Sequence, residues 1–217
     1  EGSGANQLGM VTQIYEGGAS VSPFGFVEGF KIGERVYASD IGMSIPVGEG
    51  LLGRVVDPFM RPKDGKGPIF STERVPIMKA PIDAMKRGLI DEPFSVGVKA
   101  IDGLLTCGKG QKLGIFAGSG VGKSTLMGMI VKHCVAPIKV VALIGERGRE
   151  VPEFIQKNLG GDLLGTVMVV ATSDDSSLMR KYGAFCAMSV AEDFKNKGHD
   201  VLFIMDGVTR VAMAQRG

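Results

Sequence analysis

The sequence has no tryptophan, three tyrosines and three cysteines among its 217 residues. Cys107, Cys134 and Cys186 are odd in number, widely spaced and without a Cys-x-x-Cys pair. This spacing argues against a disulfide framework and against a structural zinc site. We therefore expect a reduced, cytosolic protein in which each cysteine is a small buried apolar residue.

Long apolar runs and a strong charge of one sign are also missing. No charge-free run approaches the length of a transmembrane helix, and no signal peptide opens the chain. The formal net charge is +2, so the balance favours neither nucleic acid nor an anionic membrane as the main partner. The hydrophobic content of 44% supports a proper core.

The most informative stretch is residues 112–135. Lys112–Ala117 is a short apolar run that predicts a buried strand, and Thr125–Val135 predicts a helix. Between them lies the sequence Ala-Gly-Ser-Gly-Val-Gly-Lys-Ser, residues 117–124. This is a phosphate-binding loop with alanine in place of the usual leading glycine.

Each residue type in this loop suits the phosphates of a nucleotide. Its glycines let the backbone turn tightly and bring N–H groups close to an anion, at the start of a helix whose dipole favours negative charge. Lys123 adds a positive charge for the β- and γ-phosphates, and the Ser124 hydroxyl is placed to ligate Mg²⁺. We expect ATP and Mg²⁺ to bind here. The predicted loop residues are Gly118, Ser119, Gly120, Val121, Gly122, Lys123, Ser124 and Thr125.

Apolar runs and helical stretches alternate over residues 83–217. The apolar runs are continuous, as in a parallel sheet that is buried on both faces, so the pattern predicts an α/β fold with right-handed crossovers. The predicted strands are Lys112–Ala117, Lys139–Gly145, Thr166–Thr172 and Val201–Asp206. The predicted helices are Lys123–Val135, Glu150–Asn158 and Leu178–Lys197.

The first part of the chain has a different pattern. Residues 1–45 contain short strand-like runs, Gln7–Tyr15 and Ser20–Phe26, separated by glycines, and predict part of a small β-barrel. Residues 46–82 are broken by prolines and glycines, apart from a short strand at Leu51–Val56, and predict a linker wrapped on the core.

Charged residues follow two of the predicted strands. Asp206 ends five apolar residues, and downstream of a phosphate loop we favour a metal-binding role over that of an ordinary turn residue. Glu146 begins a charged stretch after residues 139–145 and is placed to polarise an attacking water. Arg147 either neutralises charge on the γ-phosphate or pairs with Glu146 to position it.

The remaining polar candidates are more ambiguous. Arg149 and Glu150 fit a salt bridge in the first turn of a solvated helix as well as they fit a functional role. Residues 172–177 suit helix capping better than nucleotide sensing. Arg210 faces either the phosphates or solvent. The isolated residues His133 and His199 receive no role.

Two other classes of nucleotide-binding protein are disfavoured. A GTPase would carry an Asn-Lys-x-Asp motif after a strand, and none is present. A helicase would show a basic or aromatic platform for single strands, for which the low aromatic count offers little.

The motifs together resemble a known superfamily. The phosphate loop, Gly-Glu-Arg-x-x-Glu at 145–150 and Asp206, in this order, resemble the rotary ATPases and the type III export ATPases. Residues 91–102 resemble the stretch that leads into the nucleotide domain there. Thr-Cys-Gly-Lys-Gly-Gln at 106–111 is similar to the export ATPases, and to the flagellar members most closely. The resemblance is loose over 1–45 and tight from about Val47 onward.

The resemblance implies a RecA-like P-loop domain with a mainly parallel sheet, preceded by part of the small N-terminal β-barrel. It implies a Mg²⁺-ATPase that assembles into a homohexameric ring with sites between subunits. It also implies that Lys123 and Ser124 bind phosphate and metal, that Glu146 activates water and that Asp206 supports Mg²⁺. Arg147 and Arg210 match arginines near the phosphates.

The implied function is the energising or priming of flagellar type III protein export. The implied partners are a stator-like regulator, a stalk protein, the export gate, export substrates and their chaperones, but not nucleic acid. The implied location is the cytoplasm, at the cytoplasmic face of the inner membrane, with peripheral association only.

The chain departs from the family pattern at three positions. Gly207 stands where a small polar residue is usual, Val211 where an aromatic is usual and Gly217 where an acidic residue is usual. The resemblance also places the arginine finger, the adenine-stacking aromatic and a C-terminal helical domain after the last residue. We therefore expect residues 83–217 to be a C-terminally truncated domain, and we expect the 217 residues alone to bind nucleotide but to hydrolyse it slowly.

Four alternatives stay open. An injectisome export ATPase would perform the same hydrolysis with different partners. A rotary synthase catalytic subunit is disfavoured by Thr106-Cys107. A non-catalytic ring subunit is disfavoured because Lys123, Glu146 and Asp206 are all intact. A nucleic-acid motor is disfavoured by the composition.

Overall fold

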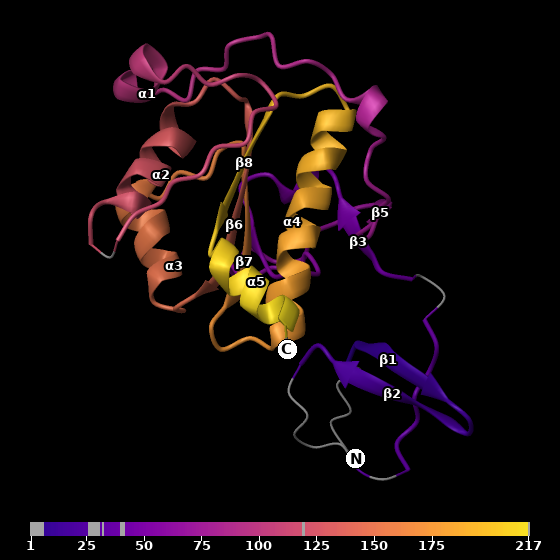
Figure 1. The fold of residues 1–217 in the computed structure, drawn as a ribbon. Coiled ribbons are helices and arrows are strands. Elements are labelled where there is room, and N and C mark those ends of the chain that lie inside the picture. The colour runs from indigo at the N-terminus through magenta and orange to yellow at the C-terminus, as the bar shows by residue number, and fades with distance from the viewer. Residues whose placement is uncertain (1–6, 26–30, 32, 40–41, 119, 217) are drawn as a thin grey trace.

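The structure is a computed structural model that describes residues 7–25, 31, 33–39, 42–118 and 120–216. Its elements follow one another from a β-rich N-terminal part to an α/β part (Figure 1). In chain order they are β1 (Gly9–Tyr15), β2 (Gly18–Pro23), β3 (Ser44–Val47), η1 (Glu49–Leu51), β4 (Val55–Val56), β5 (Glu73–Pro76), η2 (Ala84–Lys86), α1 (Lys99–Leu104), α2 (Lys123–His133), β6 (Ile138–Glu146), α3 (Glu150–Glu153), η3 (Phe154–Asn158), β7 (Thr166–Thr172), α4 (Ser177–Asn196), β8 (Val201–Asp206) and α5 (Val208–Arg216).

The main sheet has four strands in the order β4-β7-β6-β8, and every neighbouring pair is parallel. The runs predicted at Lys139–Gly145, Thr166–Thr172 and Val201–Asp206 form β6, β7 and β8. The predicted α/β fold with a mainly parallel sheet is therefore confirmed.

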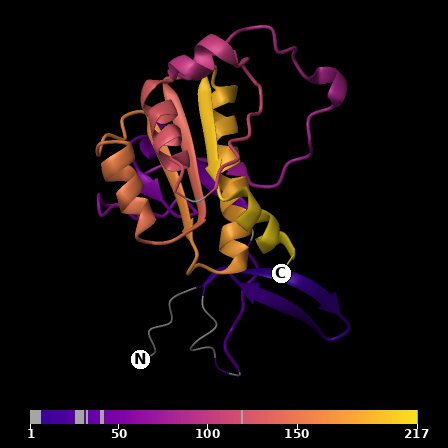
Figure 2. The ribbon, with the colours of Figure 1, turned by 60° about the vertical axis from the view of Figure 1, so that its left-hand side comes forward.

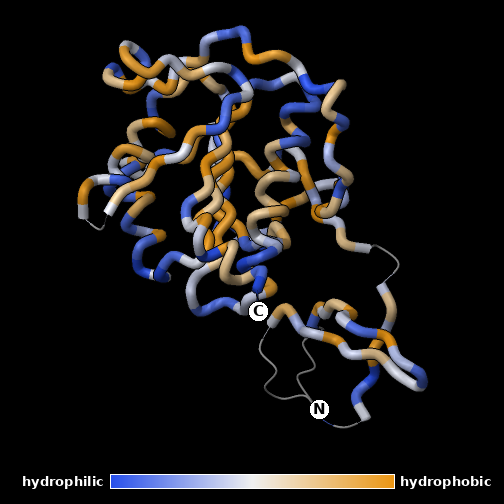
Figure 3. Tube along the Cα trace, viewed as in Figure 1, coloured by the Kyte–Doolittle hydropathy of each residue, from blue (hydrophilic) through white to orange (hydrophobic). Residues whose placement is uncertain are grey.

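Helices cover both faces of this sheet (Figures 1 and 2). On β6, Val140, Ala142 and Ile144 pack in a cluster with side chains of α4. Val141 and Leu143 point the opposite way and pack with side chains of α2 and α3. The strand is hydrophobic on both faces because each face is covered, which accounts for its unbroken apolar run. Figure 3 shows the hydrophobic residues gathered on the central strands.

The prediction of a buried strand at Lys112–Ala117 is wrong in this structure. Residues 112–118 are in no strand, and Leu113, Ile115 and Phe116 are exposed. Among the described residues β8 pairs with β6 and with no other strand. A strand forms only where a neighbour accepts its ladder hydrogen bonds, and apolar composition carries no information about that neighbour.

The stretch 46–82, expected to wrap the core, also enters it. Within this stretch β4 is an edge strand of the main sheet, and β5 pairs with β3. Val47, Leu51 and Val56 are at most 1% exposed. The predicted strand Leu51–Val56 is shortened to β4, and η1 precedes it.

The described N-terminal residues form the antiparallel hairpin β1–β2. The hairpin lies at the end of the α/β part near the chain's C-terminus (Figures 1 and 2). The Ser176 hydroxyl, which caps α4, donates a hydrogen bond of 2.8 Å to the Phe24 carbonyl. Phe26, the last residue of a predicted strand, lies outside the described residues. No helix in the described part of the chain combines the length and apolar character needed to cross a bilayer.

Replacing Leu51 with alanine tests whether the 46–82 stretch belongs to the core. Because Leu51 is fully buried, we expect Leu51→Ala to lower the free energy of unfolding by about 2–5 kcal/mol. Leu89, 88% exposed, is the matched control, and Leu89→Ala should cost less than about 0.5 kcal/mol. Urea unfolding measures both. Equal losses in the two variants would contradict the packing described above.

Candidate phosphate and metal site at the sheet edge

The phosphate loop ends at the first residue of α2. Gly122 is the N-cap of that helix with φ of 96°, and Gly120 has φ of 76°. Both conformations lie in the left-handed region, which glycine adopts without the steric cost borne by other residues. Ser119 lies outside the described residues. The glycines thus turn the backbone so that the loop runs directly into the N-terminus of α2, where backbone N–H groups lack intrahelical acceptors.

Lys123 and Asp206 meet although they are 83 residues apart. The Lys123 ammonium donates a hydrogen bond of 2.6 Å to the Asp206 carboxylate. Asp206 is the last residue of β8 and is buried, whereas the Lys123 side chain is about one-third exposed. In this structure the buried Asp206 carboxylate, next to the end of the phosphate loop, is therefore paired with the positive charge of Lys123.

The oxygen atoms at this point fit a magnesium ion. Mg²⁺ prefers hard oxygen ligands, and beside a nucleotide it uses one or two protein groups together with water and phosphate oxygens. Asp206 offers a carboxylate that already attracts a cation. Ser124, exposed in the first turn of α2, offers a hydroxyl. Within the described residues, no three His, Cys, Asp or Glu side chains form an all-protein metal cluster.

A β-bulge sets the direction of Glu146. The register between β6 and β7 shifts between Ile144 and Glu146, and the skipped residue is Gly145 with φ of 73°. Bulges of this kind re-aim a side chain at the end of a strand. The Ser173 N–H donates a hydrogen bond of 2.9 Å to the Glu146 carbonyl oxygen and fixes the backbone after the bulge.

The environment of Glu146 raises the pKa of its carboxyl group. Burial is the main cause, and the nearby carboxylates of Glu150 and Asp206 act in the same direction. Arg210 opposes them, because its guanidinium donates a hydrogen bond to the Glu146 carboxylate. A buried glutamate with a raised pKa is suited to accept a proton near neutral pH.

The two arginine candidates occupy different surroundings. Arg147 is largely exposed and lies 3.7 Å from the Glu150 carboxylate. Exposed pairs of this kind contribute little stability, about 0–1 kcal/mol. Arg210, on α5, pairs with Glu146 instead. The sequence does not predict this pair, because it joins residues that are 64 positions apart.

The residues given structural roles behave as expected. Ser176 caps α4 by accepting a hydrogen bond of 3.2 Å from the Met179 N–H, so the capping prediction for 172–177 is confirmed. The three cysteines are free thiols and buried, as predicted, and burial raises the pKa of Cys186 to about 12. None of them is suited to act as a nucleophile.

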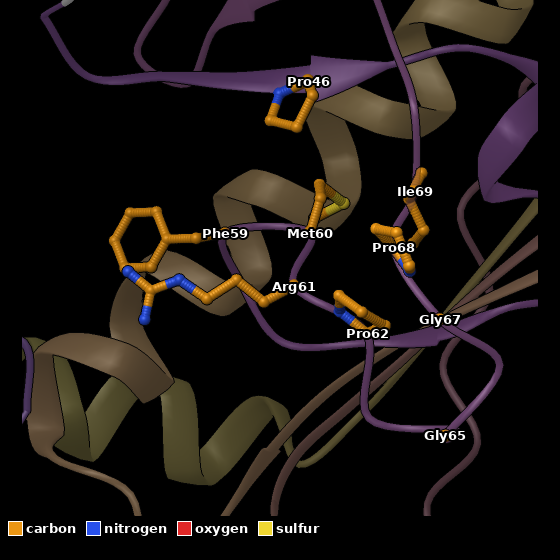
Figure 4. Close-up of a pocket in the computed structure, with 9 residues that line it drawn as sticks. All are labelled: Pro46, Phe59, Met60, Arg61, Pro62, Gly65, Gly67, Pro68 and Ile69. Atoms are coloured by element: carbon orange, nitrogen blue, oxygen red, sulfur yellow. The ribbon is translucent and has the colours of Figure 1, made fainter.

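A hollow elsewhere on the chain lacks comparable chemistry. It lies between the segment after β4 and Pro46 of β3 (Figure 4). Among the described residues that line it, Arg61 is the only charged one, and its guanidinium lies 5.7 Å from the centre of the Phe59 ring. It is lined by Pro46, Phe59, Met60, Arg61, Pro62, Gly65, Gly67, Pro68 and Ile69. The described lining residues include no acid, base or nucleophile that could take part in a reaction.

Comparison with known families decides the class. The model of the ATP synthase alpha/beta family, nucleotide-binding domain, matches residues 97–217, more than half of the chain. The chain belongs to this ATP synthase alpha/beta family. The matched range contains the phosphate loop, Glu146 and Asp206.

Curated relatives within the family are flagellar and secretion ATPases. The "Flagellum-specific ATP synthase" of Helicobacter pylori is 65% identical over 98% of this chain and 49% of its own length. The protein of the same name from Bacillus subtilis is 49% identical, over 98% of this chain and 47% of its own length. The "Type 3 secretion system ATPase" of Xanthomonas euvesicatoria is 47% identical, over 91% of this chain and 45% of its own length. The chain thus spans about half the length of the curated relatives it matches.

A solved structure extends the similarity to the fold. The assembled ATPase EscN, in complex with its central stalk EscO from the enteropathogenic E. coli type III secretion system, matches with a TM-score of 0.92 and 45% identity. The match covers 99% of this chain and 53% of that chain. The resemblance to type III export ATPases is confirmed.

The raised pKa of Glu146 predicts that Glu146→Gln stabilises the fold. Above its raised folded pKa the carboxylate is ionised in both states, and the folded state carries the cost of burying that charge. The gain in stability of Glu146→Gln over the parent should be largest at pH 7–8. It should shrink as the pH falls toward 4.5, the ordinary pKa of a glutamate carboxyl group. Melting temperature against pH measures it.

Glu16→Gln is the control, because Glu16 is exposed in the turn between β1 and β2. It should leave the melting temperature nearly unchanged. A Glu146→Gln variant that is less stable than the parent at pH 7, or a difference that does not depend on pH, would contradict the account of this carboxyl group.

Proposed function

We propose that the protein containing this chain is a Mg²⁺-dependent ATPase that energises or primes flagellar type III protein export. The observation that carries the proposal is the convergence of the phosphate loop, Lys123, Asp206 and Glu146 at one edge of a parallel sheet. Ligands of open α/β sheets bind at this edge, outside the carboxyl ends of the strands.

The loop and Lys123 bind the phosphates in this proposal. Backbone N–H groups at the start of α2 face the phosphate oxygens, and the helix dipole favours their negative charge. Lys123 leaves Asp206 and pairs with the β- and γ-phosphates, which supply more negative charge than one carboxylate. Asp206 and Ser124 are then the residues that hold Mg²⁺, whose positive charge offsets the charge of the phosphates.

Glu146 is the general base. Its carboxylate accepts a proton from the attacking water, which strengthens the water as a nucleophile toward the γ-phosphorus. Burial supports this role, because it raises the proton affinity of the carboxylate and limits competing solvent. Arg147, exposed and paired with Glu150, has no direct link to the reaction beyond its place in the motif.

Flagellar export is favoured over the injectisome by sequence similarity. The flagellar relative from Helicobacter pylori is 65% identical, whereas the secretion ATPase from Xanthomonas euvesicatoria is 47% identical. Both classes share the same chemistry, so the injectisome remains the second candidate and differs in cargo. A rotary synthase subunit is a weaker candidate, because Thr106-Cys107 resembles the export ATPases rather than the synthases.

The ring and its partners are part of the same proposal. The solved EscN structures are of the assembled ATPase, one with its central stalk EscO. By analogy we propose a homohexamer, a stalk protein and a stator-like regulator at the export gate, together with export substrates and chaperones. We also propose a cytoplasmic location at the inner-membrane face.

Substitutions at two positions separate binding from hydrolysis. Lys123→Ala should weaken ATP binding and abolish turnover, because the phosphates lose their main cation. Glu146→Gln should retain ATP binding and lose about 10²–10⁴-fold in kcat, the usual contribution of a general base. Calorimetric binding and phosphate release with the full-length protein measure the two effects. Normal turnover in Glu146→Gln would put the base elsewhere.

The proposed ring predicts a dependence on protein concentration. If each site is completed by a neighbouring subunit, the specific ATPase activity of the full-length protein rises with concentration until the ring is assembled. Chromatography with light scattering checks that the rise follows oligomer formation. A specific activity that stays flat across monomer and oligomer would contradict sites shared between subunits.

A further inference from the structure

We propose that Gly128 of α2 is a positioning residue, seated against Asn158 of η3, that fixes the distance between the phosphate loop and Glu146. Gly128 lies outside the site and acts on the reaction through α2, the helix whose first turn carries Lys123 and Ser124. This role rests on the proposed function, because it needs a nucleotide on the phosphate loop and a general base at Glu146.

The contact between α2 and η3 leaves no room for a side chain at position 128. A β-carbon built on Gly128 would lie 2.6 Å from Cβ and 2.9 Å from the carbonyl oxygen of Asn158. Two non-bonded carbon atoms are in ordinary contact at about 3.5–4.0 Å. The backbone of α2 therefore touches η3 directly, and a methyl group at position 128 would push the two elements apart by about 1 Å.

Glycine at position 128 is explained by packing and not by its own backbone conformation. Gly128 lies in the interior of the 11-residue helix α2, where glycine is less favourable than alanine. Its φ is not among the left-handed values of the chain, so its backbone angles do not require glycine. The close approach of Asn158 does require it.

The element that meets Gly128 is a π-helical turn. η3 continues α3 without a break, and the Leu159 N–H donates a hydrogen bond of 3.1 Å to the Phe154 carbonyl oxygen. Such widened turns are rare and are frequently found at functional sites. Asn158 is the last residue of the turn. The widened backbone is thus the part of the α3–η3 segment that meets α2.

Apolar side chains beside the contact make it stiff. Met127 and Val131 of α2 are buried in one cluster with Phe154 and Leu159 of the segment that it touches. α2 and α3 lie on the same face of the sheet (Figures 1 and 2). Close-packed interiors transmit a displacement. A shift at Gly128 is therefore passed to the start of α2, about 7.5 Å away along the helix.

The two parts of the site are carried by different elements. Lys123 and Ser124 belong to α2, whereas Glu146 and Asp206 are the last residues of β6 and β8 in the sheet. If α2 moves away from η3, its contacts with the phosphates move with the helix. The distance from the phosphates to the general base changes, because the base stays on the sheet.

Kinetics of the full-length protein test this role. We expect Gly128→Ala to lower kcat for ATP by about 10–100-fold, the effect of misplacing reacting groups by about 1 Å. The affinity for ATP without Mg²⁺, measured by calorimetry, should change by less than about twofold, because Lys123 and the loop move with the helix. A folded variant with the parental kcat, or with an equal loss of ATP affinity, would overturn the proposal.

A second substitution tests whether the effect passes through the contact. Asn158→Gly removes the β-carbon that lies nearest to position 128. In the Gly128→Ala background it should raise kcat by at least about threefold, because the two residues are energetically coupled. If Asn158→Gly leaves kcat unchanged or lowers it further in that background, the loss does not arise from this contact and the proposal is wrong.

Val190→Ala is the matched control for a loss of stability. Val190 is fully buried on α4, in the cluster on the other face of the sheet, so its truncation lowers the melting temperature without touching α2. Well below that temperature, kcat should stay within about twofold of the parental value. If both variants lose kcat equally, activity follows stability alone and Gly128 has no positioning role.

A wedge on the η3 side provides a second variant should Gly128→Ala not fold. Asn158→Val places a branched β-carbon beside Gly128, and it should show the same loss of kcat with unchanged affinity for ATP. A folded Asn158→Val variant with the parental kcat would contradict the proposal.

The outcomes separate failure of this role from failure of the proposed function. If the parent protein shows no Mg²⁺-dependent ATP hydrolysis, or Glu146→Gln retains full activity, the proposed function fails and the role of Gly128 fails with it. If the parent hydrolyses ATP and depends on Glu146 while Gly128→Ala keeps the parental kcat, only the role of Gly128 fails.

Discussion

The parallel register of β6 with its two neighbours is the constraint on which the site depends. Leu143 on β6 pairs with Asp206 on β8, and Glu146 pairs with Thr172 on β7. These pairings bring Asp206, the proposed metal ligand, and Glu146, the proposed base, to one edge of the sheet, although the two residues are distant in sequence. A shift of one residue in either pairing would turn these side chains to the other face.

The site is built at some cost to the stability of the fold. Glu146 is buried among other carboxylates, and the raised pKa of its carboxyl group is the sign of that cost. Gly145 and Gly207 hold left-handed conformations that no other residue adopts without strain. The hydrophobic packing of β6 against α4 and against α2 offsets these unfavourable contributions to the free energy of folding, because the strand is covered on both faces.

Periodicity and motif were sufficient for the strands β6, β7 and β8, for their helices and for the α/β class of the fold. These features depend on local composition. The wrong strand at Lys112–Ala117, the entry of β4 into the sheet and the Glu146–Arg210 pair depend on which distant segment becomes a neighbour. A single sequence does not carry that information. The glycine at 207, noted only as a departure from the family pattern, gains its meaning from the Ile144 carbonyl beside it.

The most direct test is a structure of the full-length protein with Mg²⁺ and a non-hydrolysable ATP analogue. Our account predicts phosphates at the N-terminus of α2, with the Lys123 ammonium within hydrogen-bonding distance of them and no longer on Asp206. A nucleotide bound away from this loop, or a Lys123 that still pairs with Asp206 in the presence of bound nucleotide, would contradict it.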